Sequence, residues 1–312
     1  MLSNFVKRVI GSSSGAVSRR TTSTFQPGDF CMLRHVRTNK KFFIGPLEHD
    51  GRRDLKGGII GHDQVIDKPV RSVIRTHNDA AAYMVHFPTL DEYVLNVPRS
   101  CTPIYPKDAS TIVQFLDIEP GQQILEAGTG NGSLTLYLAR AVAGGKVHTF
   151  DVREAHSRTA QKHVQRYARG CYAPTVDFHL GPVSETLPTI IQQPEFFDGI
   201  ILDMPDPNKE IPRLLPYLRN DRFLVCYLPN MTQVLDLARM IKPLPLVMED
   251  CIETEWKEWE VRSTQIRSRQ DEEDEENRIA WVCRPKNHDV RGHTAFLVRL
   301  RKCENVEGDG KK

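Results

Sequence analysis

The sequence predicts a doubly wound α/β domain preceded by a small N-terminal β domain. Three observations support this fold class. From residue 108 onward, apolar strand patterns alternate with amphipathic helical patterns, which is typical of a sheet covered by helices. Residues 28–97 instead show short strand patterns separated by turn residues, without a long helical period. A glycine-rich turn joins the first strand and helix of the α/β domain, as in nucleotide-type pockets.

Each expected element follows from the local pattern of apolar residues. In the β domain, strands are expected at 30–33, 41–44, 81–87 and 92–95. In the α/β domain, strands are expected at 124–127, 146–151, 175–179, 200–203, 223–228, 246–253 and 294–300, and helices at 109–116, 134–142, 155–168 and 231–241. The domain limits are placed at 28–97 and 98–303, and residues 304–312 are expected to form a disordered tail.

A polar stretch separates the last two expected strands. Residues 263–277 contain almost no apolar side chains and include the acidic run 271–276, so we expect a solvated, mobile loop. Trp256 and Trp259 precede this stretch. Their spacing of three is more typical of packing residues than of residues that read a base.

The composition is that of an ordinary soluble globular protein. Charged residues make up 26% of the chain, hydrophobic residues 39%, and the formal net charge is only +2, so overall charge does not indicate a nucleic-acid binder. No apolar stretch approaches the length of a membrane span, and no membrane association is expected. The seven cysteines and eleven histidines are scattered without metal-ligand spacing, so we expect reduced cysteines and no metal site.

The first 27 residues differ from the rest of the chain in composition. They contain Lys7, Arg8, Arg19 and Arg20, many Ser and Thr residues, and no acidic residue. Apolar residues between positions 2 and 10 fall on one helical face. This composition is typical of a mitochondrial transit peptide, so we expect localisation to the mitochondrial matrix. A disordered basic tail is the alternative.

The glycine-rich turn indicates a binding site for a ribonucleoside cofactor. Gly128, Gly130 and Gly132 follow an apolar strand, and glycine lets the backbone approach a ligand closely. The helix that begins directly afterwards points its free N–H groups at that ligand. The next strand ends at Asp151, whose carboxylate can accept hydrogen bonds from both hydroxyls of a ribose. Such a pocket suits S-adenosylmethionine or NAD.

Three details favour S-adenosylmethionine over NAD. The glycines follow the pattern G-x-G-x-G instead of the G-x-G-x-x-G that seats a pyrophosphate. Glu126 directly precedes the turn, where a carboxylate repels a phosphate but suits a cationic sulfonium ligand. A second acidic strand end follows at Asp203. A purely structural glycine turn is the alternative. The residues expected to bind the cofactor are Glu126, Gly128, Thr129, Gly130, Asn131, Gly132, Ser133, Asp151 and Asp203.

Five segments of the chain resemble segments that occur in the same order in one known family. They lie at 99–109, 125–130, 227–234, 256–262 and 292–297. The most specific motifs within them are Tyr-Pro-Lys-Asp, Leu-Pro-Asn and Gly-His-Thr-Ala-Phe-Leu, whereas the glycine motif is generic to methyltransferases. In these motifs the chain resembles the tRNA adenine-58 N1-methyltransferases. It looks closest to their bacterial single-subunit branch, in which Thr-Pro precedes the Tyr-Pro-Lys-Asp motif. The likeness runs from about residue 57 to residue 302.

The resemblance implies a fold, an assembly and residue roles. It implies that the α/β domain is a Rossmann-like, seven-stranded class I methyltransferase domain, that the chain forms a homotetramer, and that S-adenosylmethionine is its cofactor and tRNA its substrate. It assigns Asp203 as the catalytic aspartate, Asp151 as the ribose acid and Tyr105 as an aromatic residue beside the target base. Tyr227 is a weaker candidate for an aromatic residue beside the target base. Asn208 stands where the family usually has Trp, which leaves the RNA target open.

The expected methyl transfer depends on stabilising the positive charge that develops on the base, and it does not need a strong base. N1 of adenine is a neutral nucleophile, and positive charge moves from sulfur to the ring as the methyl group transfers. The Asp203 carboxylate, by accepting a hydrogen bond from the exocyclic N6–H, would orient the ring and stabilise that charge. Because adenine 58 lies inside a folded T-loop, it has to leave its stack. Phosphate contacts that offset this cost are expected from Arg99, Lys107, Arg262 and Arg299.

The leading hypothesis is a mitochondrial tRNA methyltransferase that acts on N1 of adenine 58. The alternatives are the same chemistry on mitochondrial rRNA or mRNA, a non-catalytic RNA-binding or assembly subunit that kept the fold, and a nicotinamide-dependent dehydrogenase. The joint presence of Glu126, the three glycines, Asp151 and Asp203 disfavours the non-catalytic subunit.

Overall fold

The computed structural model describes residues 24–265, 279–286 and 292–304. Most of the predicted transit peptide, the whole acidic run 271–276 and nearly all of the predicted tail lie outside the described residues. In the part of the chain that is described, no helix has both the length and the apolar character needed to cross a membrane.

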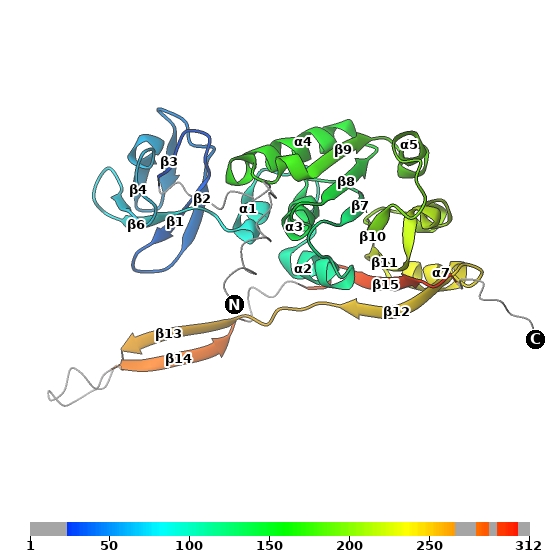
Figure 1. The fold of residues 1–312 in the computed structure, drawn as a ribbon. Helices are drawn as coiled ribbons and strands as arrows, with labels where there is room; N and C mark the ends of the chain where they lie inside the picture. Colours follow the sequence, from blue (N-terminus) through cyan, green and yellow to red (C-terminus); the bar gives the residue numbers. More distant parts are fainter. Residues whose placement is uncertain (1–23, 266–278, 287–291, 305–312) are drawn as a thin grey trace, which may run out of the picture.

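A seven-stranded sheet forms the centre of the larger domain (Figure 1). Its strands are β7 (Gln123–Ala127), β8 (Lys146–Asp151), β9 (Val176–Leu180), β10 (Phe197–Leu202), β11 (Leu218–Leu228), β12 (Leu246–Glu253) and β15 (Phe296–Lys302). Their order is β12-β15-β11-β10-β7-β8-β9, in which the strands from β11 to β9 are parallel and β15 is antiparallel to both neighbours. The predicted α/β architecture is therefore confirmed.

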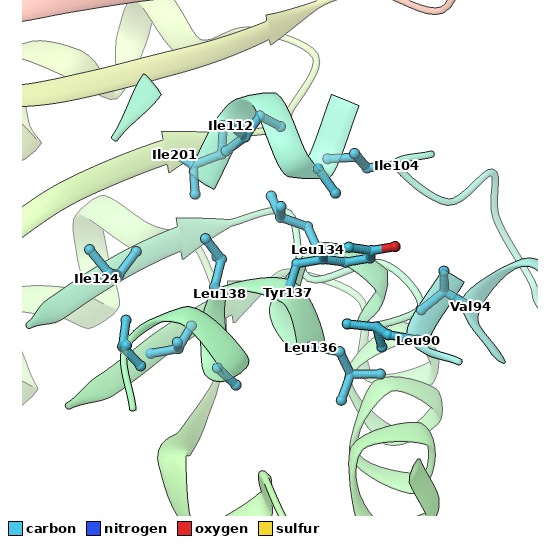
Figure 2. Packing of buried hydrophobic residues seen from close by; sticks show 14 of the residues in the cluster. Leu90, Val94, Ile104, Ile112, Ile124, Leu134, Leu136, Tyr137, Leu138 and Ile201 are labelled. Carbon is cyan, nitrogen blue, oxygen red and sulfur yellow. The ribbon is translucent and has the colours of Figure 1, made fainter. Parts of the chain in front are cut away.

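Helices cover both faces of this sheet, because its central strands bury side chains on both sides. Along β7, Ile124 belongs to the core on one face and Leu125 to the core on the other, as the two-residue period of a strand requires. Figure 2 shows Ile112 and Leu138 in the same cluster as Ile124 and Ile201. The first core contains side chains of α2 (Pro106–Phe115), α3 (Ser133–Ala141) and α4 (Glu154–Arg166), and the second those of α5 (Val183–Ile190), α6 (Ile211–Leu214) and α7 (Met231–Met240).

The N-terminal domain is built from short antiparallel strands. Buried Leu33, Ile60 and Val85 belong to a third core, separate from the two cores of the larger domain. The expected strands at 30–33 and 41–44 are confirmed to within a few residues, as is the one at 81–87. The four-stranded sheet has the order β2-β1-β6-β5, formed by β1 (Cys31–His35), β2 (Lys41–Ile44), β5 (Val73–Arg75) and β6 (Ala82–His86), and β3 (Arg52–Leu55) pairs with β4 (Gly58–Gly61).

The expected strand at 92–95 is wrong, because these residues lie in helix α1 (Leu90–Asn96). Thr89 caps the helix: its side-chain oxygen accepts a hydrogen bond from the backbone N–H of Glu92 at 3.4 Å. The Glu92 carboxylate in turn accepts from the backbone N–H of Thr89 at 3.0 Å. This reciprocal pair is a capping box, and the Thr-x-x-Glu spacing that produces it was visible in the sequence.

Tyr93 of α1 lies at the junction of the two domains. Its ring centroid is 5.2 Å from that of Phe30 in the β domain and 4.9 Å from that of Tyr167, which follows α4. Its hydroxyl donates a hydrogen bond to the backbone carbonyl of His163 at 3.0 Å. The aromatic contacts and this hydrogen bond join the small domain to the helix that packs beside the glycine turn.

A two-stranded hairpin extends from the larger domain, formed by β13 (Trp259–Gln265) and β14 (Ile279–Pro285). The prediction that Trp256 and Trp259 are packing residues is wrong, because their exposed fractions are 56% and 53%. Residues 263–265, expected in a loop, end the first strand of the hairpin. In Figure 1 the hairpin and the small β domain lie on the same side of the sheet, the side toward which the parallel strands point.

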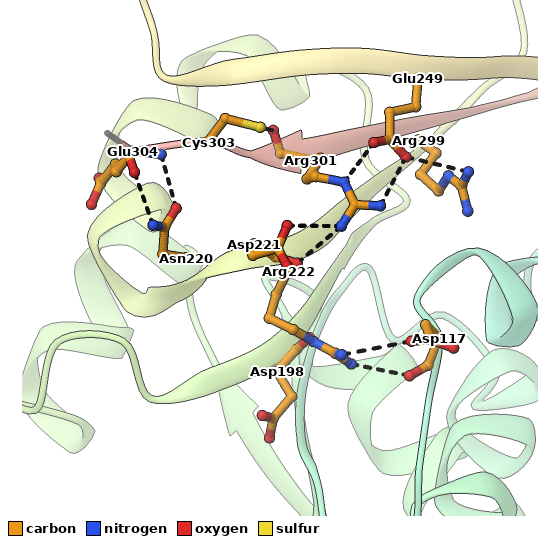
Figure 3. A network of polar contacts seen from close by, with 10 residues as sticks. All are labelled: Asp117, Asp198, Asn220, Asp221, Arg222, Glu249, Arg299, Arg301, Cys303 and Glu304. Atoms are coloured by element: carbon orange, nitrogen blue, oxygen red, sulfur yellow. Dashed lines mark hydrogen bonds and ion pairs between the residues drawn. The ribbon is translucent and has the colours of Figure 1, made fainter. Parts of the chain in front are cut away.

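Arginine side chains on β15 form ion pairs instead of the expected RNA contact (Figure 3). The Arg299 guanidinium lies 2.5 Å from Asp250 and 3.3 Å from Glu249, and it stacks over the ring of Phe223. Arg301 pairs with the same Glu249 at 2.5 Å. The prediction that Arg299 contacts phosphate is therefore wrong, since two carboxylates already neutralise it.

Candidate active site

A cavity of about 220 Å³ opens at the carboxyl ends of β7, β8 and β10. Parallel strands end together at this edge, which is where ligands bind in open α/β sheets. Four of the predicted site residues, Gly128, Gly130, Asp151 and Asp203, line the cavity. The other lining residues are Cys101, Thr102, Ala127, Phe150, Val152, Arg153, His156, Gly181, Val183, Met204 and Pro205.

Gly128 allows β7 and β10 to stay close together at the cavity floor. Its φ of +101° lies in the region that side chains rarely adopt. A Cβ atom at this position would lie 1.9 Å from the backbone oxygen of Asp203. The backbone N–H of Asp203 donates to the carbonyl of Ala127 at 2.8 Å, which continues the pairing of the two strands to this point. No residue other than glycine fits here without separating them.

Asp151, at the end of β8, is held by backbone donors on both oxygens. One oxygen accepts from the N–H of Gly130 at 3.0 Å and the other from the N–H of Arg153 at 2.8 Å. The ring of His156 lies 3.4 Å away and is the nearest side-chain partner of the first oxygen. A carboxylate has about four lone-pair sites, so Asp151 retains acceptor capacity for ligand hydroxyls on the cavity side.

Glu126 is a fully buried carboxylate next to the cavity-lining residue Ala127. One oxygen accepts a hydrogen bond from the Thr135 hydroxyl at 2.6 Å, and the other has no hydrogen-bond partner among the described residues. Burial raises the pKa of Glu126 to about 8. Ionisation of this buried carboxyl group costs free energy. A cationic group beside the unpartnered oxygen would offset that cost, so the site suits a positively charged ligand.

Asp203 lies on the cavity wall directly after β10 and is partly buried. Burial, and secondly the negative charge of Asp151, raise the pKa of Asp203 to about 7. A hydrogen-bond donor or a positive charge in the cavity would therefore stabilise the ionised form of Asp203. Perturbed carboxylates that face a cavity are typical of functional sites.

Asn131 does not line the cavity, but it holds a segment that does. Its side-chain oxygen accepts from the backbone N–H of Ser100 at 3.1 Å, and its amide donates to the carbonyl of Cys101 at 2.6 Å. The ring of His163 in turn contacts the backbone oxygen of Asn131 at 2.9 Å. The segment carrying Cys101 and Thr102 is thereby fixed against the glycine turn. Thr129 and Gly132 lie in the turn and Ser133 begins α3; these three residues, also predicted to bind the cofactor, do not line the cavity.

Tyr105 and Tyr227 are not among the residues that line the cavity. Tyr105 directly precedes α2 and is partly exposed. Burial, followed by the negative charges of Asp108 and Asp203, raises the pKa of Tyr227, which also forms a hydrogen bond with Thr294. The charge of Asp203 therefore acts on Tyr227, which stays the weaker aromatic candidate predicted from the sequence.

The Tyr-Pro-Lys-Asp motif forms a buried polar cluster, so the prediction that Lys107 contacts phosphate is wrong. The Lys107 ammonium is 2.8 Å from the Asp108 carboxylate, and their side chains are 4% and 0% exposed. The Thr294 hydroxyl donates to Asp108 at 2.8 Å and lies 2.6 Å from the Lys107 nitrogen. Thr254 donates a further hydrogen bond to Asp108. The cluster joins the start of α2 to the segments that flank β12 and β15.

His293 connects two further motifs at the same edge of the sheet. One ring nitrogen is 2.8 Å from the backbone oxygen of Pro229, and the other is 2.7 Å from the Glu253 carboxylate. The backbone carbonyl of Pro229 and the Glu253 carboxylate both raise the pKa of His293. The Leu-Pro-Asn and Gly-His-Thr-Ala-Phe-Leu motifs therefore meet at this edge of the sheet, although about sixty residues separate them in the sequence.

Comparison with known proteins identifies the family of this chain. A family model described as "tRNA methyltransferase complex GCD14 subunit" matches residues 82–296. The chain belongs to this family. The "tRNA (adenine(58)-N(1))-methyltransferase TrmI" of Thermus thermophilus is 39% identical over 272 residues, which cover 87% of this chain and 96% of that protein. The predicted resemblance is therefore confirmed.

Solved structures confirm the class I methyltransferase fold. The "tRNA (m1A58) methyltransferase TrmI" of Aquifex aeolicus superposes with a TM-score of 0.68 at 25% identity, covering 90% of this chain and 99% of that one. A "SAM-dependent O-methyltransferase" of Thermotoga maritima superposes with a TM-score of 0.72 at 24% identity, covering 93% and 99%. At that identity, the second likeness concerns the fold alone.

Sequence reasoning missed several residues that build the site. Arg153 and His156 follow the ribose acid within five positions, and that proximity was an available signal. Cys101 was an unremarkable apolar residue in the sequence, and its place in the wall depends on the distant Asn131. In the described part of the chain, no group of three His, Cys, Asp or Glu side chains is placed to hold a metal ion.

The buried ion pair makes a prediction about stability. Lys107→Met leaves the Asp108 carboxylate buried without its cation, so the free energy of unfolding should fall by about 3–5 kcal/mol. Chemical denaturation measures this loss, and Lys56→Met, at an exposed lysine in the turn after β3, is the matched control. The free energy of unfolding could instead stay unchanged while the slope of log K for RNA binding against log salt concentration falls by about one. That result would show that Lys107 contacts a phosphate after all.

Proposed function

We propose that this protein is an S-adenosylmethionine-dependent tRNA methyltransferase that methylates N1 of adenine 58 in the T-loop of mitochondrial tRNA. The observation that carries the proposal is the position of Asp203 on the cavity wall, beside Asp151 and the glycine turn. The name and 39% identity of the Thermus thermophilus relative support the reaction and the position.

The cavity residues fit the cofactor. Gly128 and Gly130 present backbone at the cavity surface, and Asp151 has acceptor capacity for the two ribose hydroxyls. The unpartnered oxygen of buried Glu126 suits the positive charge of the ligand. When bound, S-adenosylmethionine supplies an electrophilic methyl group. NAD, the alternative, would place phosphate charge among these carboxylates, which disfavours the dehydrogenase hypothesis.

Asp203 is the residue that we expect to act on the base. Its carboxylate accepts a hydrogen bond from the exocyclic N6–H of adenine, which points N1 at the methyl group. The same negative charge stabilises the positive charge that develops on the ring. Because N1 is neutral before attack, no proton has to be removed to generate the nucleophile. Tyr105 and Tyr227 supply aromatic surface for a base that has left its stack.

Changing Asp203 tests this role. Asp203→Ala should slow single-turnover methylation by roughly a hundredfold, because a preorganised charge-stabilising group contributes about 3 kcal/mol to the transition state. Since the ionised form is the active one and the pKa is about 7, kcat/KM of the wild type should rise with pH through about 7. Asp203→Asn should lose this rise along with most of the rate.

Asp151→Ala is the matched control for the Asp203 variants. It should weaken S-adenosylmethionine binding in calorimetry, while Asp203→Ala leaves that affinity largely intact. An Asp203→Asn rate within about threefold of wild type would mean that orientation dominates over charge. Normal turnover by Asp203→Ala would remove Asp203 from the mechanism.

The target and the location are tested together. Residues 1–27 are basic and free of acidic residues, which supports import into mitochondria. Cells that lack the protein should lose N1-methyladenosine from position 58 of mitochondrial tRNA and keep it in cytosolic tRNA, as measured by nucleoside mass spectrometry of the separated fractions. Loss from mitochondrial rRNA or mRNA instead would favour the alternative targets, which Asn208 in place of the family's Trp leaves open.

A homotetramer is the assembly that we expect. The exposed apolar side chains of the β13–β14 hairpin, Trp259, Val261 and Trp281, are 53%, 60% and 72% exposed, and such a surface is typical of an interface. Native mass spectrometry should give four copies for the wild type and a smaller species for the Trp259→Ser/Trp281→Ser variant. A wild-type monomer at micromolar concentration would contradict this assembly.

A further inference from the structure

Two basic segments of the small β domain lie outside the site described above. Residues 30–47 and 68–78 each contain no acidic side chain. The first segment contributes β1 and β2 and the second β5, all strands of one antiparallel sheet. Together the two segments contain seven cations: Arg34, Arg37, Lys40, Lys41, Lys68, Arg71 and Arg75.

The two segments meet at a hollow of about 310 Å³ at one end of this sheet. The backbone N–H of Val36 donates to the carbonyl of Ala82 at 3.1 Å, which brings the end of β1 to the start of β6. Arg37 and Arg75 line the hollow from opposite segments. Asp79 is the one carboxylate among the lining residues, which also include His35, Val36 and Ala80, Ala81 and Ala82.

The arginines of this hollow are available to a ligand. Arg37 and Arg75 are both exposed, and neither forms an ion pair within the described ranges 24–265, 279–286 and 292–304. Lys41, by contrast, is 2.5 Å from the carboxylate of Glu92 and is already paired. Val36, which is 51% exposed, adds apolar surface at the rim. The hollow therefore presents two unpaired guanidinium groups, which suit phosphate oxygens.

The position of the hollow favours a long polyanion over a small anion. The small β domain lies on the side of the seven-stranded sheet toward which the parallel strands point, and the catalytic cavity opens at the ends of those strands (Figure 1). A ligand that extends beyond the cavity on this side meets the small domain. Val36 and, on β5, Val73 are the exposed large apolar side chains of the two segments, which is little surface for an apolar protein partner. A phosphate backbone instead requires accessible cations.

We propose that this hollow, centred on Arg37 and Arg75, binds the sugar–phosphate backbone of the RNA whose base enters the catalytic cavity. The inference rests on the proposed function, because it takes the polyanion to be that substrate. The backbone contacts position the RNA without reading its sequence. They also contribute the binding free energy that extraction of a stacked base requires.

The test compares two double variants of the full-length protein. Arg37→Gln/Arg75→Gln should weaken binding of a tRNA transcript at least tenfold at low salt. It should lower the slope of log K against log salt concentration by about 2, because roughly one counterion is released per phosphate contact. Arg52→Gln/Arg53→Gln removes the same charge from exposed arginines of β3, outside the hollow, and should change affinity less than threefold. Equal behaviour of the two variants would overturn the proposal.

A change of opposite sign sharpens the test. Asp79→Asn removes the carboxylate of the hollow and should tighten tRNA binding. The asparagine can adopt the φ of +57° found at this position, so the fold should tolerate it. Weaker tRNA binding by this variant would contradict an anion site.

Two further measurements distinguish RNA from other anionic ligands and distinguish the surface proposal from the proposed function. Wild-type binding to phosphatidylserine vesicles or inorganic phosphate, lost in Arg37→Gln/Arg75→Gln while tRNA affinity is kept, would overturn the RNA assignment. If Arg37→Gln/Arg75→Gln methylates tRNA with an unchanged KM, the surface proposal fails and the proposed function stands. If the wild type binds tRNA through Arg37 and Arg75 but methylates no tRNA adenine, the proposed function fails and the surface stands.

Discussion

The close approach of Gly128 to the end of β10 is the constraint on which the site depends. β7 and β10 are paired up to Ala127 and Leu202, and the backbone pairing continues one residue further to Asp203. A Cβ on Gly128 would occupy the place of the Asp203 carbonyl oxygen. Because glycine removes that conflict, the turn expected to receive the cofactor and the residue expected to act on the base are held together by backbone pairing.

The site gathers carboxylates at a cost to the folded state. The raised pKa values of Glu126 and Asp203, about 8 and about 7, mean that the folded chain binds these protons more tightly than the unfolded chain. Their contribution to stability is present at low pH and is lost as the pH rises through about 7 and then 8. A cationic cofactor in the cavity offsets this cost, which couples ligand binding to the stability of the site.

Two sets of polar contacts, one buried and one exposed, join distant segments at this edge of the sheet. Lys107 and Asp108 tie the start of α2 to Thr294, and His293 ties the same segment to Pro229. A buried cluster such as that of Lys107 and Asp108 is stable only when every member finds its partner, so its geometry is specific. The motifs that identify the family most clearly therefore join segments at this edge of the sheet, while the generic glycine turn lines the cavity itself.

The sequence by itself determined the sheet, the glycine turn and the positions of Asp151 and Asp203. These features depend on local periodicity and on the rule that parallel strands end at one edge, so residues near in sequence were enough to place them. Helix α1 could also have been predicted from the sequence, because its capping box is a local pattern, although that pattern was missed. Only the tertiary structure decided that Lys107 is buried and that Trp259 is exposed. Burial and pairing depend on residues more than a hundred positions away, such as Thr294 beside Lys107, and no local pattern reports them.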